Sequence, residues 1–264
     1  MSGPVSGPVS GPIWQVLEPG LEFAEIRLPQ KSTSGDSTAR IVRADPAVFG
    51  LRLLNASARS DGAARTARDW ARSGDLVAVT NAAMYQADGR TSVSLMRAPG
   101  HVNNAHLSRD RAVLAFDPLD SGLPPIQIID RSCQDFAAVG RRYGSLVQSI
   151  RMISCKRDNV WSQQPSAWST AAIATDAGGK VLLIHVRSPY STHDLIANLL
   201  ALPLAIQRAM YLEGGPPAQL YLRAGGREIE VVGSRGSAGL GGNRSAIPIP
   251  NALGLYRLAD PDAG

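Results

Sequence analysis

Residues 171–215 have the sequence AAIATDAGGKVLLIHVRSPYSTHDLIANLLALPLAIQRAMYLEGG, and this stretch decides the fold. Two apolar runs, at 171–175 and 181–186, flank the segment 176–180, whose adjacent glycines suit a tight turn. Short apolar runs bounded by turn residues are typical of buried strands. The stretch therefore begins with a predicted β-hairpin.

The second half of the stretch predicts a helix and a third strand. Thr192 is the expected N-cap of a helix over residues 193–202, because its hydroxyl can accept a hydrogen bond from the first turn. The apolar run 209–212 then predicts a strand that ends on residues 213–215, which are Glu-Gly-Gly.

Six more segments are predicted as strands, either by alternation of apolar and polar residues or by a continuous apolar run: 21–28, 39–42, 49–55, 76–80, 112–116 and 126–129. We expect the first three to form one sheet. A helix is predicted over 63–72, where three alanines and Trp70 share a face, and Gly74 would end it. The predicted fold class is α/β (mixed α+β), with mixed, largely antiparallel β-sheets flanked by a few helices.

The chain shows no internal shift in composition that would mark a second domain. Residues 1–12 repeat Ser-Gly-Pro-Val and are too rich in glycine and proline to pack, so we expect a flexible leader or linker there. The prediction is one domain over residues 13–264.

The net charge of +5 narrows the classes of partner. It comes almost entirely from scattered arginines, whereas nucleic-acid binding needs a basic stripe with interleaved aromatic residues. We therefore expect no nucleic-acid partner, while an anionic substrate remains compatible with the charge. No apolar run reaches the ~18–20 residues of a membrane span, so none is expected.

Several motifs that carry chemistry are absent: Gly-x-Ser-x-Gly, Gly-Lys-Ser/Thr and His-Glu-x-x-His. The glycine-rich stretch 233–242 leads into Ile-Pro-Ile-Pro instead of a helix, so it predicts a flexible hairpin loop and not a phosphate loop. His101 and His106 have poor spacing for zinc. We expect no metal and no cofactor. Cys133 and Cys155 are compatible with one disulfide or with two buried thiols.

Four places remain where polar residues follow or close an apolar strand, the position at which proteins of this class tend to build sites. They are Asn81 to Tyr85, Gln148 to Arg151, His185 to His193, and Glu213 to Gly215. The third is dense in hydrogen-bond donors and leads into a helix N-terminus, which suits an anionic oxygen. The fourth presents a carboxylate beside glycines that permit close approach of a ligand.

These four places, in this order, resemble the phosphodiester glycosidase (uncovering-enzyme-like) family. The matching segments are 81–85 (Asn-Ala-Ala-Met-Tyr), 148–149 (Gln-Ser), 170–174 (Thr-Ala-Ala-Ile-Ala), 186–187 (Val-Arg), 212–215 (Leu-Glu-Gly-Gly) and 247–253, with Asn251. The signature Leu-Glu-Gly-Gly-Pro is similar to that of a bacterial subgroup. The resemblance covers roughly residues 76–258.

The resemblance implies a secreted or periplasmic hydrolase that cleaves a sugar-1-phosphodiester or a related glycosidic linkage. Its expected partner is a carbohydrate or sugar phosphate, and a homodimer is compatible with it. The expected catalytic residues are Glu213, as general base or stabiliser of positive charge, and His185 or His193, as proton shuttles. The expected substrate-binding residues are Asn81, Gln148, Arg151, Arg187, Ser188, Gly214, Gly215 and Asn251.

Three positions depart from the family pattern: Ala82 replaces a glycine, Thr170 an arginine, and Glu213 an aspartate. Catalytic geometry is sensitive to a shift of one methylene, and loss of an arginine removes an anion-binding group. Two alternatives therefore stand beside the hydrolase: a non-catalytic glycan- or sugar-phosphate-binding module on the same fold, and a secreted structural or interaction protein.

Overall fold

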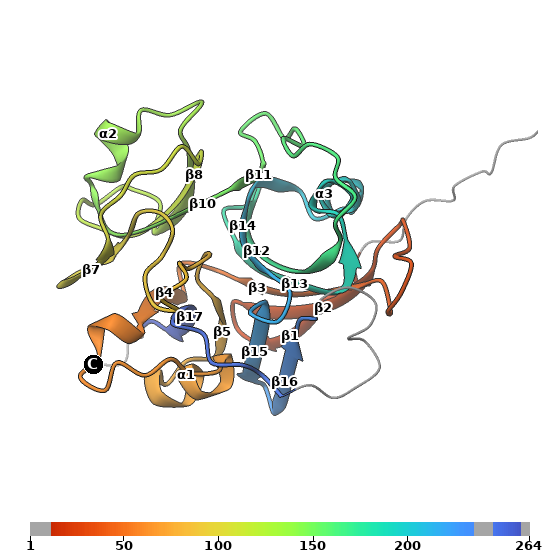
Figure 1. Ribbon diagram of the computed structural model, residues 1–264, viewed down its shortest axis with the longest axis horizontal. Helices are drawn as coiled ribbons and strands as arrows, with labels where there is room; N and C mark the ends of the chain where they lie inside the picture. The colour runs from red at the N-terminus through yellow and green to blue at the C-terminus, as the bar shows by residue number, and fades with distance from the viewer. Residues whose placement is uncertain (1–11, 235–244, 260–264) are drawn as a thin grey trace, which may run out of the picture.

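The computed structural model describes residues 12–234 and 245–259. The predicted leader, apart from Pro12, lies outside the described residues, as does most of the predicted glycine-rich hairpin loop. Three sheets and three α-helices make up the described part (Figure 1). All pairings between its strands are antiparallel, which confirms the predicted fold class.

The largest sheet contains the predicted hairpin. It has seven strands, in the order β1 (Gln15–Glu18), β2 (Leu21–Arg27), β3 (Thr38–Ala44), β13 (Val181–Tyr190), β12 (Trp168–Asp176), β14 (Ile206–Gly214) and β11 (Arg151–Ile153). The turn between β12 and β13 is held by the Asp176 carboxylate, which accepts hydrogen bonds from the N–H groups of Gly178 and Lys180. The hairpin prediction is confirmed.

Two five-stranded sheets complete the fold. One has the order β7 (His101–Asn104), β6 (Met96–Ala98), β10 (Tyr143–Ser149), β8 (Ala112–Pro118) and β9 (Ile126–Asp130). The other has the order β16 (Arg227–Val232), β15 (Gln219–Ala224), β5 (Ala78–Asn81), β17 (Asn251–Arg257) and β4 (Phe49–Asn55).

The prediction that segments 21–28, 39–42 and 49–55 form one sheet is wrong for the third segment. β2 and β3 pair with each other, but β4 pairs with β17, in the register Asn55↔Asn251 to Phe49↔Arg257. Alternation of apolar and polar residues fixes which face of a strand is buried, but it carries no information about a partner so distant in the sequence.

The helices begin at caps that differ from the predicted ones. α3 (Thr192–Ala201) is capped by Ser191, whose Oγ accepts from the Asp194 N–H at 3.1 Å, and not by Thr192. α1 (Ala67–Gly74) is capped by Thr66 and so begins four residues later than predicted. α2 (Phe136–Gly140) is a short helix that was not predicted. Polar residues adjacent in sequence compete for the cap, so a cap position is uncertain by a residue or more.

Two large apolar clusters fix the relative positions of the sheets. The first joins residues from all three sheets, and the second fills the space between the seven-stranded sheet and α3. In Figure 1 the seven-stranded sheet curves around α3, which contacts both β11 and β13. Among the residues with described structure, no helix has the length and apolar character needed to cross a membrane.

Candidate active site

Glu213 is the second-to-last residue of β14 and is positioned by a β-bulge. Ala172 pairs with Tyr211 and Ala171 with Glu213, so Leu212 is an extra residue with its side chain in the core. Bulges of this kind redirect a side chain next to a site. A Glu213 carboxylate oxygen accepts from the Gly214 N–H at 2.9 Å. Burial raises the pKa of the Glu213 carboxyl above its usual range and outweighs this hydrogen bond.

Aromatic side chains surround the end of β14. A Cβ atom on Gly214 would collide with the indole of Trp168 and the hydroxyl of Tyr211, so glycine is required where these two side chains meet. The Trp161 ring lies 5.4 Å from that of Tyr211, centroid to centroid, at an interplanar angle of 49°. Burial, and then the charge of Glu213, raise the pKa of Tyr211, so its hydroxyl stays protonated as a hydrogen-bond donor.

Sequence reasoning did not identify Trp161, Trp168 and Tyr211 as site residues. Aromatic residues make up only 5% of the chain, so two tryptophans within eight positions, just before a predicted strand, were the available signal. Aromatic rings with a polar tip suit a surface that is apolar on one side and wet on the other.

The turn that follows Glu213 is held by two of the predicted site residues. The Asn81 carboxamide oxygen, at the end of β5, accepts from the Gln219 N–H at 3.2 Å. The His185 imidazole, on β13, bonds the Ala218 carbonyl through Nε2 at 3.1 Å. Gly215 donates its N–H to the Ser169 carbonyl on β12 at 2.9 Å. Three strands therefore fix residues 215–219, and Glu213 precedes this fixed segment.

Some buried polar atoms near this turn have no hydrogen-bond partner among the described residues: Asn81 Nδ2, Thr170 Oγ1 and His185 Nδ1. Buried polar atoms are rarely left unpaired, and a ligand is one way of satisfying them. The Asn81 amide is therefore anchored through its oxygen and offers its nitrogen. Thr170 pairs with Gly214 across β12 and β14, so its hydroxyl belongs to the same region.

His185 is wholly buried, and this burial lowers its pKa to about 4. The imidazole is therefore neutral at pH 7, and its Nε2–H donates to the Ala218 carbonyl. A group so far from its protonated form at neutral pH is suited to holding the turn.

Asn251 begins β17 next to the end of β5, and its carbonyl accepts from the Ala82 N–H at 2.9 Å. Its side chain, however, bonds within the protein. The oxygen accepts from Asn55 Nδ2 at 2.7 Å, and the nitrogen donates to the Arg90 carbonyl at 3.3 Å. Asn251 thus supports the loop that follows Asn81.

Gln148 is a fully buried residue of β10, and its amide is saturated by main-chain groups of two segments. Its oxygen accepts from the Ser108 N–H at 2.9 Å and from the Leu95 N–H at 3.4 Å. Its nitrogen donates to the carbonyls of Ser108 and Asp110, at 3.1 and 2.8 Å. The Gln148 side chain fixes the loop before β8.

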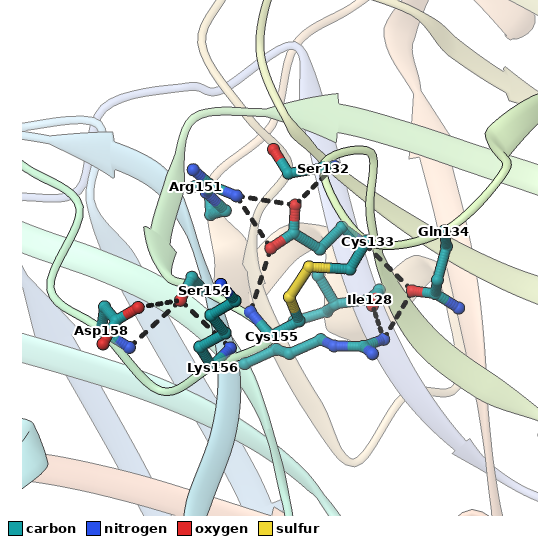
Figure 2. The surroundings of a disulfide bond; sticks show 11 residues. Ile128, Ser132, Cys133, Gln134, Arg151, Ser154, Cys155, Lys156 and Asp158 are labelled. Carbon is teal, nitrogen blue, oxygen red and sulfur yellow. Dashed lines mark hydrogen bonds and ion pairs between the residues drawn. A yellow bond between two sulfur atoms is a disulfide. The ribbon is translucent and has the colours of Figure 1, made fainter.

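Arg151 lies beside a disulfide between Cys133 and Cys155, which decides between the two states left open for the cysteines (Figure 2). Arg151 Nη1 contacts both Asp130 carboxylate oxygens, at 2.8 and 2.9 Å. Burial acts to raise the pKa of Asp130, but the N–H groups of Ser132 and Cys155, together with Arg151, lower it. This cluster ties the end of β9 to the first residue of β11 and to the turn that follows β11.

We expect the Cys133→Ser/Cys155→Ser variant to unfold about 3 kcal/mol more easily than the wild type. The bond closes a loop between cysteines 22 positions apart, and opening that loop raises the entropy of the unfolded chain. For a chain of this size the melting temperature should fall by roughly 5–10 °C. Thermal unfolding followed by circular dichroism measures the shift. Reductant should lower the wild-type melting temperature but not that of the variant, and an equal effect on both would contradict the role of the disulfide.

Arg187 and Ser188 lie near the end of β13, and Arg187 lines a cavity there. Arg187, Asp36 and Arg40 line a cavity of about 230 Å³ together with β16. Ser188 Oγ accepts from the Ser37 N–H at 2.8 Å and donates to the Asp36 carboxylate at 3.2 Å. This cavity contains both signs of charge.

His193 lies in the first turn of α3 and is partly exposed. Its Nδ1 is 3.3 Å from the Asp194 carboxylate, and its carbonyl accepts from Asn159 Nδ2 at 2.9 Å. Asn159 and Trp161 belong to the same loop, and Trp161 contacts Tyr211. His193 is thus connected to the surroundings of Glu213 through this loop.

The predicted site residues fall into four groups. Asn81, His185, Glu213, Gly214 and Gly215 meet at the turn after β14, with Asn251 behind Asn81. Arg187 and Ser188 lie at the cavity beside β16, and His193 lies at the start of α3. Gln148 and Arg151 hold a loop and a disulfide region.

The fold is similar to that of solved structures that are distant in sequence. The catalytic domain of zebrafish N-acetylglucosamine-1-phosphodiester alpha-N-acetylglucosaminidase, auto-inhibited by its pro-peptide, has a similar fold, with a TM-score of 0.60 at 12% identity. The match covers 96% of this chain and 85% of that one.

A sequence model of the phosphodiester glycosidases matches residues 74–256, and the chain belongs to this family. A hypothetical protein from Synechocystis also has a similar fold, with a TM-score of 0.60 at 14% identity. The match covers 94% of this chain but only 64% of the Synechocystis protein. None of the curated proteins matches the chain.

Proposed function

We propose that the chain hydrolyses a sugar-1-phosphodiester, or a related glycosidic linkage, with Glu213 as its reacting carboxylate. The observation that carries this proposal is the Glu213 carboxyl, whose pKa is raised by burial, at the start of a turn fixed by Asn81 and His185. Membership of the phosphodiester glycosidase family supports the reaction class.

In the proposed reaction, the bond between the anomeric carbon and the phosphodiester oxygen breaks, and the bonding electrons leave with the phosphate. Water adds to the anomeric carbon and loses its proton to the Glu213 carboxylate. The products are the free sugar and a phosphate monoester. Because the phosphate is already a good leaving group, the reaction needs less acid assistance than cleavage of an ordinary glycoside.

The remaining groups have supporting roles in this proposal. Asn81 Nδ2, which has no bond to the described protein, donates to a sugar hydroxyl. Trp168 and Tyr211 provide the face against which the sugar ring packs. Arg187 attracts the phosphate, whereas Arg151 is engaged by Asp130. His185 positions the turn, and His193 is left as the candidate proton carrier.

The substrate test uses methyl phosphodiesters of N-acetylglucosamine 1-phosphate, glucose 1-phosphate and mannose 1-phosphate, with release of free sugar measured by chromatography. The first is included because the zebrafish protein is named for an N-acetylglucosamine-1-phosphodiester. Release of sugar from any of the three supports the proposal. Absence of release from all three, at micromolar protein over a day, counts against it.

The pH dependence of kcat/KM should show an acid limb above the usual range of a carboxyl group. The reaction uses the Glu213 carboxylate, and burial raises the pKa at which this carboxylate forms, so activity rises only as the pH passes that raised value. The profile is measured between pH 4 and 9 at constant ionic strength. An acid limb at or below pH 4.5, the ordinary value for glutamate, would show that another group controls the rate.

A non-catalytic glycan-binding module is the second candidate. It is favoured by Thr170, which stands where the family pattern has an arginine. The buried hydroxyl of Thr170 has no hydrogen-bond partner among the described residues. Calorimetry with the same three phosphodiesters separates the candidates. Binding without release of sugar supports the module, and release of sugar supports the hydrolase.

We further propose that the protein works outside the cytoplasm. The Cys133–Cys155 disulfide supports this, because such bonds form and persist mainly in oxidising compartments. The test is to fractionate the source cells and to detect the protein in each fraction. We expect it in the medium or the periplasm. Recovery in the cytoplasm alone would overturn it.

A further inference from the structure

A basic cavity lies on the loop that Gln148 holds. Its volume is about 540 Å³, and its lining is His106, Leu107, Ser108, Arg109, Arg111 and Arg131. Three of its six lining residues are arginines, which bind phosphate oxygens in a bidentate manner. The reaction centre described above uses none of them.

The loop that carries these arginines is fixed from two sides. Arg131 Nη1 donates to the carbonyls of Ser108 and Asp110, at 2.7 and 2.8 Å. The buried Gln148 nitrogen donates to the same two carbonyls. The N–H of Arg131 also donates to the Arg111 carbonyl at 2.9 Å. A loop held in this way presents its cations without the full entropy cost of ordering a free loop on binding.

The charges in this cavity are not neutralised within the described protein. Over residues 12–234 and 245–259, neither Arg109 nor Arg111 forms an ion pair. The neighbouring acid, Asp110, has its Oδ2 bonded by the hydroxyls of Ser94 and Ser108, at 3.1 and 2.8 Å. Two exposed guanidinium groups therefore remain available to an external anion.

The cavity is connected to the surroundings of Glu213 through β10. Gln148 is followed two residues later by Ile150, whose carbonyl accepts from the Tyr211 N–H at 2.9 Å. Ser108 also bonds Ser94, in the segment that follows Asn81 along the chain. Residues 148–150 therefore link the loop that carries Arg109 and Arg111 to Tyr211, which lies two residues before Glu213.

We propose that this cavity binds a phosphate group of the substrate other than the one that is cleaved. The substrate is then a polyanion, a saccharide chain with repeated phosphodiesters, and Arg109 and Arg111 bind a phosphate farther along it. This inference rests on the proposed function for the identity of the substrate, whereas the binding of phosphate by the cavity does not.

The first experiment measures binding alone, so it holds even if no turnover is found. Calorimetry with inorganic tripolyphosphate and with inorganic phosphate is carried out on the wild type and on Arg109→Gln/Arg111→Gln. The matched control is Arg27→Gln/Arg141→Gln, which removes two exposed arginines that line none of the described cavities. We expect Arg109→Gln/Arg111→Gln to weaken tripolyphosphate binding about tenfold or more, and the control variant to change it less than twofold.

An equal loss of tripolyphosphate affinity in both double variants would show that net charge alone attracts the anion. Absence of tripolyphosphate binding by the wild type would show that the cavity is not a phosphate site. Either result overturns the proposal. The second experiment compares a sugar-1-phosphate methyl diester with an oligosaccharide joined by phosphodiesters. The ratio of KM for the oligosaccharide to KM for the methyl diester should rise about tenfold in Arg109→Gln/Arg111→Gln. If tripolyphosphate binding falls while this ratio stays constant, the site binds free phosphate and the assignment to substrate is wrong.

Discussion

The Glu213→Gln variant is expected to lose about 10²- to 10⁴-fold in kcat on a sugar-1-phosphodiester, with its fold intact. In the wild type the Gly214 N–H donates to a Glu213 carboxylate oxygen. Glutamine preserves the size of the side chain and keeps an oxygen that can accept this hydrogen bond. It cannot accept the proton of water or carry the negative charge that stabilises the anomeric carbon. Single-turnover and steady-state rates on purified protein measure the loss.

The same substitution should leave the protein at least as stable at pH 7.5. Burial raises the pKa of Glu213, so the folded state favours the neutral acid and loses stability as the pH rises through the ordinary glutamate value of 4.5 toward the raised one. Glutamine removes this loss. Glu18→Gln, which changes a carboxylate paired with Arg257 on an edge strand, is the matched control and should retain full turnover. Unchanged turnover in Glu213→Gln would eliminate the role given to this residue.

The wild-type protein should lose about 3 kcal/mol of stability through His185 as the pH falls from 6.5 to 4. Full burial lowers the pKa of the folded imidazole to about 4, whereas the unfolded chain binds the proton near 6.5. The contribution of His185 to the free energy of unfolding is therefore fully present above pH 6.5. It is lost as the pH falls toward 4, because the unfolded chain binds the proton more tightly than the folded protein does.

His185→Gln isolates this term, because glutamine can still donate an N–H to the Ala218 carbonyl but does not titrate. Urea unfolding at pH 7.5, 6, 5 and 4.5 gives the free energy of unfolding of both proteins. The difference between them should shrink as the pH falls, since only the wild type loses the His185 contribution. A difference that is independent of pH would mean that folding does not lower the pKa of His185.

Local patterns predicted the elements of this fold well and their partners poorly. The hairpin of β12 and β13 follows from two apolar runs around adjacent glycines, all within 20 residues. The pairing of β4 with β17 joins segments about 200 residues apart, and no local pattern encodes such a partner. The helix cap moved from Thr192 to Ser191 because both hydroxyls lie within reach of the first turn.

Residues of the candidate site could be selected from sequence, but their contacts could not. Asn81, His185 and Glu213 were selected because each lies on or at the end of an apolar strand, and the structure places all three around the turn after β14. Asn81 and His185, however, bond to main-chain atoms of Gln219 and Ala218. Because every residue has these main-chain atoms, the sequence does not indicate such contacts. Gln148 has the polarity of a binding residue, yet its amide faces a loop of the protein itself.

The central position of β17 has a consequence for how the chain folds. This strand lies between β5 and β4, so a sheet whose first strand ends at residue 55 is completed only when residues 251–257 have left the ribosome. Until then, two apolar strands have unpaired edges. Such long-range pairing predicts folding on the order of milliseconds to seconds, with an aggregation-prone intermediate. We therefore expect a nascent chain of this protein to bind chaperones that hold extended apolar segments until β17 has been made.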